Sequence, residues 1–285
     1  MRPSSELKQD FDVMAGLGDI VDVLKTATMV QFRTFQAREK PDVVFVREAE
    51  DILLDILARM EGDHVRHPFF YDRSALPSLI LVVSSDEGFL GEINTQIVNA
   101  ALDQRSSSYD EMIVLGSHGA RYLEDMKIKH TIFPALTDKV SPAEVQKITD
   151  VLLDRYRKAV GRLIVVYPEF LSLTSQKVSV WRGLPSLERA AKPQLRAGAE
   201  GLLIEPTPTR VLEGLIELWF ASKMFQLFWS SKLAEYAARI MHLEGSSQEL
   251  QLRRKKLSLE YFRQVHTLRD KVIREITSSR QIADN

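Results

Sequence analysis

Ser84 to Gly91 is the stretch whose residue types come nearest to a binding loop. It follows an apolar run and precedes a helical pattern, which is the setting in which a loop binds phosphate at a helix N-terminus. The stretch is neither a Walker A sequence nor a G-x-G-x-x-G sequence, and it contains no lysine. We therefore favour a structural strand-to-helix turn over a nucleotide-binding loop.

Other reactive side chains lack the partners that their chemistry needs. His64 and His67 would bind a metal only with further ligands, and the chain has no cysteine and no clear third ligand. Adjacent carboxylates such as Asp86 and Glu87 point apart in a turn, and the serines just before them have no G-x-S-x-G setting. We predict no catalytic residue, no cofactor and no metal site.

Two further groups each allow two interpretations. The run Arg253-Arg254-Lys255-Lys256 is typical of a solvated helix face, but it would also suit phosphate or an acidic loop of a partner. An aromatic group would form either a membrane-facing patch or a packed core, and we favour the core. That group is Trp219, Phe220, Phe225, Phe228 and Trp229.

Composition narrows the class of protein. The 285 residues carry a net charge of -1, whereas nucleic-acid binding needs a basic surplus, so we expect no nucleic acid partner. The absence of cysteine fits a reducing compartment. The N-terminal stretch lacks the apolar core of a signal peptide, and no stretch of 18 residues is free of charge. We expect a soluble cytoplasmic chain with no direct membrane span.

The stretch from Pro208 to about Arg280 predicts one very long helix. No proline interrupts it, and its apolar residues recur at helical spacing. Roughly 70 helical residues span about 105 Å, whereas a globule of this length has a radius of gyration of about 19 Å. We therefore expect the helix to project and its apolar stripe to need a partner. The last part of the stripe is Leu257, Tyr261, Val265, Leu268, Val272 and Ile276.

The remaining elements form an α/β order. Helical patterns run from Leu7 to Phe35, preceded by Ser4 and Ser5, and from Val43 to Met60, and Pro41 kinks or restarts the helix between them. Strands and helices then alternate, which predicts a mostly parallel sheet covered by helices. Expected strands are 79–83, 112–115, 128–133, 163–167, 177–181 and 202–205, and expected helices are 91–102, a short one near Arg121, and one from Pro142 to about 160 with Ser141 as N-cap.

The predicted fold class is therefore α/β, with a small Rossmann-like domain and two long terminal helices. Each terminal helix needs apolar cover, so we expect the two to pack as an antiparallel coiled coil. The predicted domains are residues 1–61 as N-terminal coiled-coil helix, 77–206 as Rossmann-like domain, and 207–285 as C-terminal coiled-coil helix.

Several motifs in this order resemble the gamma subunit of F-type ATP synthases, which is the central stalk. The resemblance covers nearly the whole chain, and it is strong because the motifs occur together in the right order and spacing. The matching stretches are Lys25 to Val30, Arg66-His67-Pro68-Phe69, Val82 to Asn94, Ile113 to Arg121, Glu205-Pro206 to Leu212, and Ser230 to Met241.

The resemblance implies a non-catalytic rotary stalk subunit that transmits torque during proton- or sodium-driven ATP synthesis or ATP-driven ion pumping. Implied partners are the alpha and beta subunits of the catalytic ring, the epsilon subunit and the c-subunit rotor ring. The implied location is peripheral, on the cytoplasmic face of the bacterial inner membrane. Implied partner contacts are Lys25, Met29, Arg33, Asp86, Arg239, Arg253, Arg254, Lys255, Arg263, Val265, His266 and Arg269.

The sequence also departs from the family pattern. Glu244-Gly245-Ser246 replaces an alanine-rich stretch, and Val265-His266 replaces an Arg-Gln pair that contacts the catalytic subunits in the family. These departures suggest a divergent member, which we associate with a sodium-translocating type. They also leave an alternative function, a stand-alone coiled-coil adaptor or regulator that retains the gamma fold.

Overall fold

The computed structural model describes residues 4–38, 41, 43–60, 69, 73, 75–185, 205 and 207–283. Two compact units divide the chain. We call residues 31–239 the sheet unit, and we call residues 1–30 together with 240–285 the helix-pair unit. Among the described residues, no helix has the length and apolar character needed to cross a membrane.

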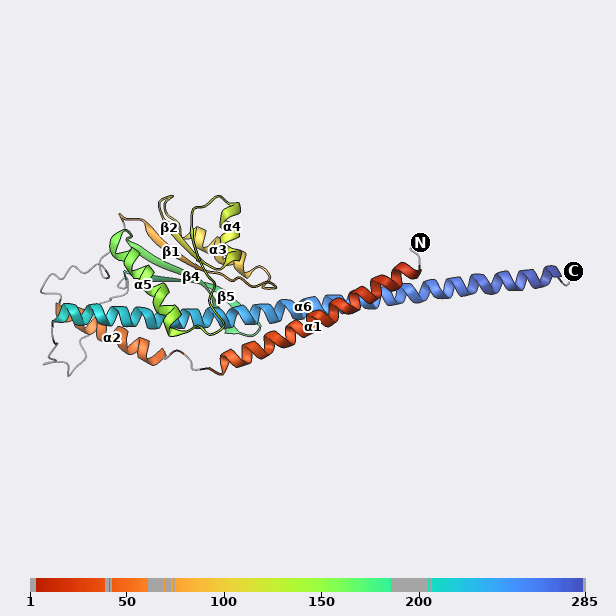
Figure 1. Cartoon of the computed structure of the whole chain (residues 1–285), viewed down its shortest axis with the longest axis horizontal. Helices are drawn as coiled ribbons and strands as arrows, with labels where there is room; N and C mark the ends of the chain where they lie inside the picture. The colour runs from red at the N-terminus through yellow and green to blue at the C-terminus, as the bar shows by residue number, and fades with distance from the viewer. Residues whose placement is uncertain are drawn as a thin grey trace. The chain divides into compact units, whose positions relative to one another are not determined.

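The sheet unit is built on a five-stranded sheet of order β3-β2-β1-β4-β5 (Figure 1). Its first four strands in this order are parallel, and β5 runs antiparallel to β4. The central strand β1 is fully apolar after its first residue and fully buried, as expected for a parallel strand covered on both faces. The strands are β1 (Ser78–Val83), β2 (Glu111–Leu115), β3 (Thr131–Phe133), β4 (Arg162–Ser172) and β5 (Ser175–Leu184).

Helices α3 (Ile93–Asp103) and α4 (Ser117–Asp125) cover one face of the sheet. Alternate strand residues point to this face, because side chains along a strand have a period of two. They form a core with apolar residues of both helices. The core includes Ile80, Val82, Met112, Val114, Ile164 and Val166 from the strands, with Ile97, Val98, Ala101, Ala120 and Leu123 from the helices.

The opposite face is covered by α5 (Pro142–Lys158) and by part of α6 (Pro208–Ala283). After β3 the chain reverses its direction across the sheet, so a right-handed crossover through α5 places that helix on the second face. Ser141 caps α5 as predicted, since its hydroxyl accepts a hydrogen bond from the Glu144 N–H at 3.2 Å. The Trp181 ring lies 5.7 Å from the Phe220 ring, which seats α6 on this face.

The aromatic group of α6 forms a core, as the sequence predicts. Trp219, Phe220, Phe228 and Trp229 are buried and Phe225 is half-buried. Helix α1 (Ser4–Gln36) contributes to the same packing within the sheet unit, where Phe35 stacks on Trp229 at 4.2 Å. Helix α2 (Val43–Met60) begins two residues after Pro41, so the helix restarts there.

The helix-pair unit consists of the first part of α1 and the last part of α6, packed antiparallel. Lys25 Nζ lies 3.0 Å from Glu244, and Ser247 donates to Asp22 at 2.9 Å. The Arg254 guanidinium lies 4.9 Å from the centre of the Phe11 ring. Because the partner residue in α6 rises in number as the α1 residue falls, the two helices run in opposite directions. The predicted packing of the terminal helices is confirmed.

Two strands differ in extent from the prediction. We expected a strand over 128–133, but the Ile128 N–H donates to the Leu123 carbonyl at 2.9 Å and Lys127 has φ 57°, so these residues close α4 and β3 begins at Thr131. Strand β5 is longer than the predicted 177–181 because it pairs with β4 in a hairpin. Leu202 to Ile204 of the last predicted strand lie outside the described residues. The division into domains at 61, 77 and 206 stays a prediction.

Candidate functional site

Doubly wound sheets bind ligands at the C-terminal ends of the two strands where the strand order reverses. In this sheet those strands are β1 and β4. Successive crossovers leave β1 in opposite directions across the sheet, which opens a crevice between these two strands. Ser84 and Ser85 follow β1 in this crevice, and Pro168 of β4 lies opposite. This position is where a nucleotide would bind if the turn after β1 were a phosphate loop.

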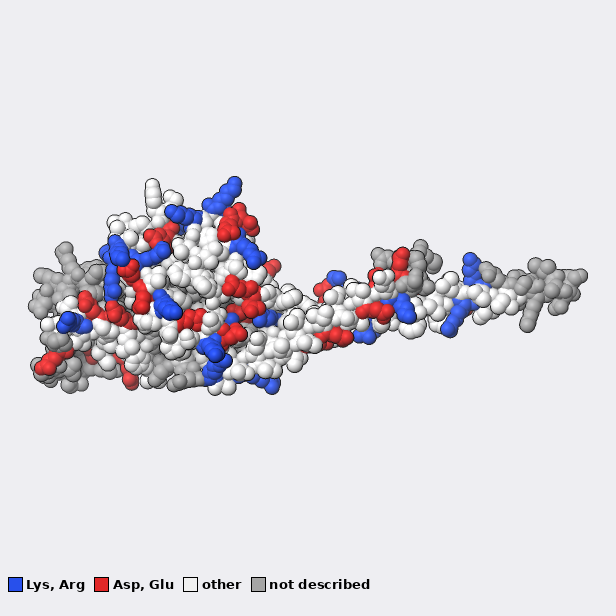
Figure 2. Space-filling model, viewed as in Figure 1, with Lys and Arg blue, Asp and Glu red and all other residues white. Residues whose placement is uncertain are grey.

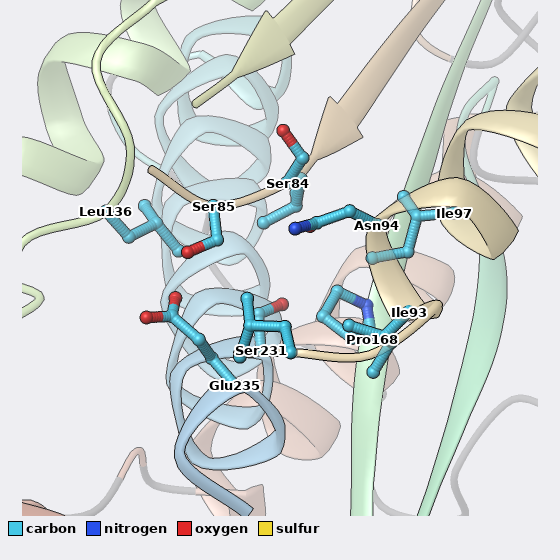
Figure 3. A pocket seen from close by; sticks show the side chains of 11 residues that line it. Ser84, Ser85, Ile93, Asn94, Ile97, Leu136, Pro168, Ser231 and Glu235 are labelled. Carbon is cyan, nitrogen blue, oxygen red and sulfur yellow. The ribbon is translucent and has the colours of Figure 1, made fainter. Parts of the chain in front are cut away.

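Helix α6 fills this crevice. Ser231 and Glu235 of α6 line the remaining space together with Asn94 of α3 (Figure 3). That space has a volume of only about 10 Å³, which is near the minimum for one water molecule. The sheet unit therefore offers no room for a nucleotide at its switch point, which supports the structural interpretation of Ser84 to Gly91.

The turn after β1 is held by contacts with the turn after β2. The Ser84 hydroxyl donates to the Leu115 carbonyl at 2.6 Å, and the Gly119 N–H donates to the Ser84 oxygen at 3.1 Å. A side chain at Gly116 would place its Cβ 2.8 Å from the Ser85 backbone, and Gly116 also has φ 92°. These glycines explain the Gly-x-x-Gly spacing as close packing between two turns.

Asp86 and Glu87 have separate roles in this turn. The Asp86 carboxylate accepts N–H groups from Ser117 at 2.5 Å and Ala135 at 3.3 Å, so it joins the turn to α4 and to the loop after β3. Burial raises the pKa of Asp86, but the hydrogen bonds from Ser117 and Ala135 outweigh burial and the pKa is lowered. Glu87 instead reaches Arg239 of α6 at 3.2 Å. The two carboxylates do not form an acid/base pair.

A cluster of charged residues on α6 faces the same edge of the sheet. Lys232, Glu235 and Arg239 are all buried, which is rare for charged side chains unless they are paired. Glu235 lies 3.0 Å from Lys232 and 3.4 Å from Arg239. Lys232 also lies 3.2 Å from Asp138, in the loop between β3 and α5. We call these four residues, with Glu87, the crevice charge cluster.

The environment shifts the ionisation of this cluster in both directions. Burial raises the pKa of Glu235, and the nearby charges of Lys232 and Arg239 only partly oppose it. Burial also raises the pKa of Asp138, but the hydrogen bond from the Tyr236 hydroxyl at 2.8 Å and the Lys232 charge outweigh it, so the pKa is lowered. Burial raises the pKa of Tyr236 well above its ordinary value, so this phenol remains a donor.

The structure places the predicted contact residues in different settings. Arg239 and Asp86 lie in the sheet unit and make the contacts described above. In the helix-pair unit, Lys25 pairs with Glu244 and Arg254 lies over the Phe11 ring. Arg253 pairs with Glu249 on the same helix. Their roles as partner contacts stay a prediction. Of the others, Met29 and Val265 are half-buried, and Arg33, Lys255, Arg263, His266 and Arg269 are exposed.

The sequence interpretation missed Lys232, Glu235 and Asp138 as a group. A signal was present, because charged residues at positions i, i+3 and i+7 interrupt an otherwise small and apolar helical stretch. No group of metal-ligating side chains occurs in the part of the chain that the structure describes. His64 and His67 lie outside the described residues.

Fold and site together define a class of protein. A doubly wound sheet whose ligand crevice is filled by its own long helix, together with an antiparallel helix pair that includes the same helix, defines an α/β protein with long packed terminal helices. Comparison with known proteins gives the family. Residues 4–278 match the family model described as ATP synthase.

The relatives with similar sequences are named ATP synthase gamma chain. The ATP synthase gamma chain of Dictyoglomus turgidum is 25% identical over 279 residues, covering 96% of this chain and 95% of the relative. The rotor of the Euglena gracilis mitochondrial ATP synthase has a TM-score of 0.65 at 16% identity, covering 93% of this chain and 98% of that chain. The central stalk and c-ring structure of the Tetrahymena thermophila mitochondrial ATP synthase has a TM-score of 0.52 at 17% identity, covering 82% and 99%.

The chain belongs to the ATP synthase gamma chain family, as a divergent member and the non-catalytic central-stalk subunit of the F-type enzyme.

Proposed function

We propose that this chain transmits torque between the membrane rotor and the catalytic ring. Its partners are then the alpha and beta subunits of the ring, the epsilon subunit and the c-subunit rotor ring. The assembly lies peripherally on the cytoplasmic face of a bacterial inner membrane. It couples proton or sodium flow to ATP synthesis, or ATP hydrolysis to ion pumping, and the sodium-translocating type stays a prediction.

One observation carries the proposal. Helix α6 is continuous over 76 residues and belongs to both compact units. In the sheet unit most of its large apolar side chains are buried, with Leu218 an exception, and in the helix-pair unit it exposes several large apolar side chains. A continuous helix is able to transmit a turning force along its length. The exposed side chains are Met241, Leu252, Leu259, Phe262, Leu268, Val272, Ile273 and Ile276.

The exposed apolar side chains suit a partner whose conformation must be shifted. A stalk changes the state of a catalytic subunit only if it binds two of its conformations with different free energy. Moving a subunit from mostly closed to mostly open needs about 5.5 kcal/mol of difference. At about 25 cal/mol per Å² this is roughly 220 Å² of apolar contact, which a few exposed side chains supply.

The solved relatives support the membrane side of the proposal. The Euglena gracilis chain belongs to a rotor, and the Tetrahymena thermophila chain to a central stalk with a c-ring. On the face shown in Figure 2, positive and negative side chains are interspersed over the sheet unit. A mixed surface suits contacts with protein loops better than binding to a phosphate backbone.

The test is a truncation in the assembled ATP synthase. Deletion of Gln264 to Asn285 removes exposed apolar side chains of α6 and leaves the sheet unit intact. We expect ATP-driven ion pumping to fall relative to ATP hydrolysis, while the circular dichroism melt of the truncated chain retains the transition of the sheet unit. A matched control is Leu76→Ala, which removes an exposed apolar side chain of the sheet unit.

Two outcomes would contradict the proposal. Loss of the sheet-unit transition in the truncated chain would show that this segment serves folding. Purification of the tagged full-length chain without nucleotide-binding ring subunits would favour the alternative, a stand-alone adaptor with the gamma fold.

A further inference from the structure

We propose that α6 is the permanent ligand of the sheet crevice, and that Lys232 and Arg239 are positioning residues that fix the rotational setting of α6 against the sheet. The crevice then has the function of a joint and not of a binding site for a diffusing molecule. This inference rests on the proposed function, because a joint of this kind matters only if α6 carries torque.

Helix α6 packs closely against the sheet, and part of this contact is polar. Ala234 of α6 is completely buried, and the Phe170 N–H of β4 donates to the Ser230 hydroxyl at 3.0 Å. Ser231 is buried too, and its hydroxyl bonds to the Leu227 carbonyl of its own helix at 2.7 Å. Ser231 is a small residue that lines the crevice beside Ser85 and Pro168, so the α6 backbone can lie close to the strand ends there (Figure 3).

Two ion pairs act at different heights along the helix. Lys232 pairs with Asp138 at 3.2 Å, and Arg239 pairs with Glu87 at 3.2 Å. The two cations are seven residues apart, so they project from nearly the same side of α6 about 10 Å apart along its axis. Their partners come from different loops, the first after β3 and the second after β1. A rotation of α6, or a slip by one turn, would break both pairs.

Glu235 completes the arrangement between the two cations. It lies within 3.4 Å of both Lys232 and Arg239, so it holds the two side chains in place from the same helix. Lys232 and Arg239 are buried, whereas the side chains of their partners Asp138 and Glu87 are 60% and 59% exposed. Ion pairs with an exposed partner add little to stability, whereas charged groups have been shown to specify register in some systems. Apolar ridges alone allow one helix to shift by a turn against its neighbour. The ion pairs therefore specify the rotation and register of α6 in a contact that apolar packing already stabilises.

The test uses neutral variants of the two loop carboxylates in the assembled ATP synthase. Glu87→Gln and Asp138→Asn, alone and together, retain side-chain size and remove the charge that faces α6. Glu92→Gln is the matched control, because Glu92 is exposed, lies just beyond the same turn and makes no side-chain capping bond to α3. We measure ATP hydrolysis, ATP-driven ion pumping against an increasing opposing gradient, and urea unfolding of the isolated full chain.

We expect the double variant to hydrolyse ATP but to stop pumping at a smaller opposing gradient than the wild type, with Glu92→Gln unchanged. Glu87→Asp, which keeps the charge, should recover part of the loss that Glu87→Gln causes. A role in stability alone would instead lower the urea midpoint and leave the limiting gradient unchanged. If the wild type pumps and the double variant pumps to the same limit, the joint is wrong while the proposed function stands. If the wild-type assembly hydrolyses ATP without pumping, the proposed function itself fails.

Discussion

The two parts of α6 show opposite relations between apolar side chains and solvent. In the sheet unit, Phe220 and Phe228 are 0% exposed, whereas Leu252 and Ile273 in the helix-pair unit are 62% and 60% exposed. The helix is the same in backbone conformation, so the difference lies in what covers it. The apolar side chains of α6 in the sheet unit are covered by other residues of the chain, whereas those in the helix-pair unit remain available to a partner.

Polar contacts differ between the units in the same way. The charges of Lys232 and Glu235 are buried, so each depends on its partner for compensation. Lys25 and Glu244 in the helix-pair unit are partly exposed and screened by water and salt. The comparison teaches that α6 carries buried charges where it meets the sheet, whereas the charges of the helix-pair unit are partly exposed.

The largest expected effect compares two phenylalanines of α6. Phe220→Ala leaves a cavity in the sheet unit and should lower the free energy of unfolding by about 3–5 kcal/mol. Phe262→Ala removes an exposed ring and should change it by no more than about 0.5 kcal/mol. Urea unfolding of the full chain followed by circular dichroism measures both. Equal losses for the two variants would contradict the comparison.

An intermediate effect compares two glycines. Gly116→Ala should destabilise the sheet unit by roughly 1–3 kcal/mol, because the residue has a positive φ and the added Cβ would meet the Ser85 backbone. Gly245→Ala, in open space on α6 of the helix-pair unit, should stabilise its helix by about 1 kcal/mol. Thermal melts of the two variants against wild type give the signs. A neutral Gly116→Ala variant would show that the two turns can separate without cost.

The smallest expected effect is a pH dependence in the sheet unit. The folded pKa of Asp138 is lowered, so its contribution to stability is present above the unfolded value of about 3.9 and is lost as the pH falls through the folded pKa. The raised pKa of Glu235 acts with the opposite sign, since a group that holds its proton more tightly in the folded chain favours folding at low pH. Asp138→Asn should therefore reduce the loss of stability on acidification below about pH 4.

The measurement is the urea midpoint as a function of pH for wild type and Asp138→Asn. If the urea midpoint falls as steeply with decreasing pH in Asp138→Asn as in wild type, Asp138 is not the source of this pH dependence.

Much of the fold follows from local pattern. The helical repeat of the C-terminal stretch predicted α6, the short apolar runs predicted β1, β2 and β4, and the Ser141-Pro142 pair predicted the start of α5. Prediction was weaker at β3, because the αL conformation of Lys127 closes α4 where the apolar pattern still resembles a strand. The extent of β5 depends on its pairing with β4, which local propensity does not specify.

The candidate contact residues were harder to place from the sequence than the helices and strands were. Asp86 and Arg239 lie in motifs that the sequence marked, but the side chains that surround them come from loops far along the chain. Periodicity marked only part of the exposed surface of the helix-pair unit. Leu268, Val272 and Ile276 of the predicted apolar stripe are exposed, whereas the exposed Leu252, Leu259, Phe262 and Ile273 lie outside that stripe.

By itself the sequence determined the long helices and the alternation of strands and helices. These follow from spacings of three, four or two residues, which short-range backbone geometry imposes. The resemblance to the family was carried by the sequence motifs and not by these spacings. Only the tertiary structure decided that α6 occupies the crevice of the sheet and that Glu87 and Asp138 meet Arg239 and Lys232. Such pairings join residues about a hundred or more positions apart, and they depend on how the whole sheet is ordered, which no local repeat encodes.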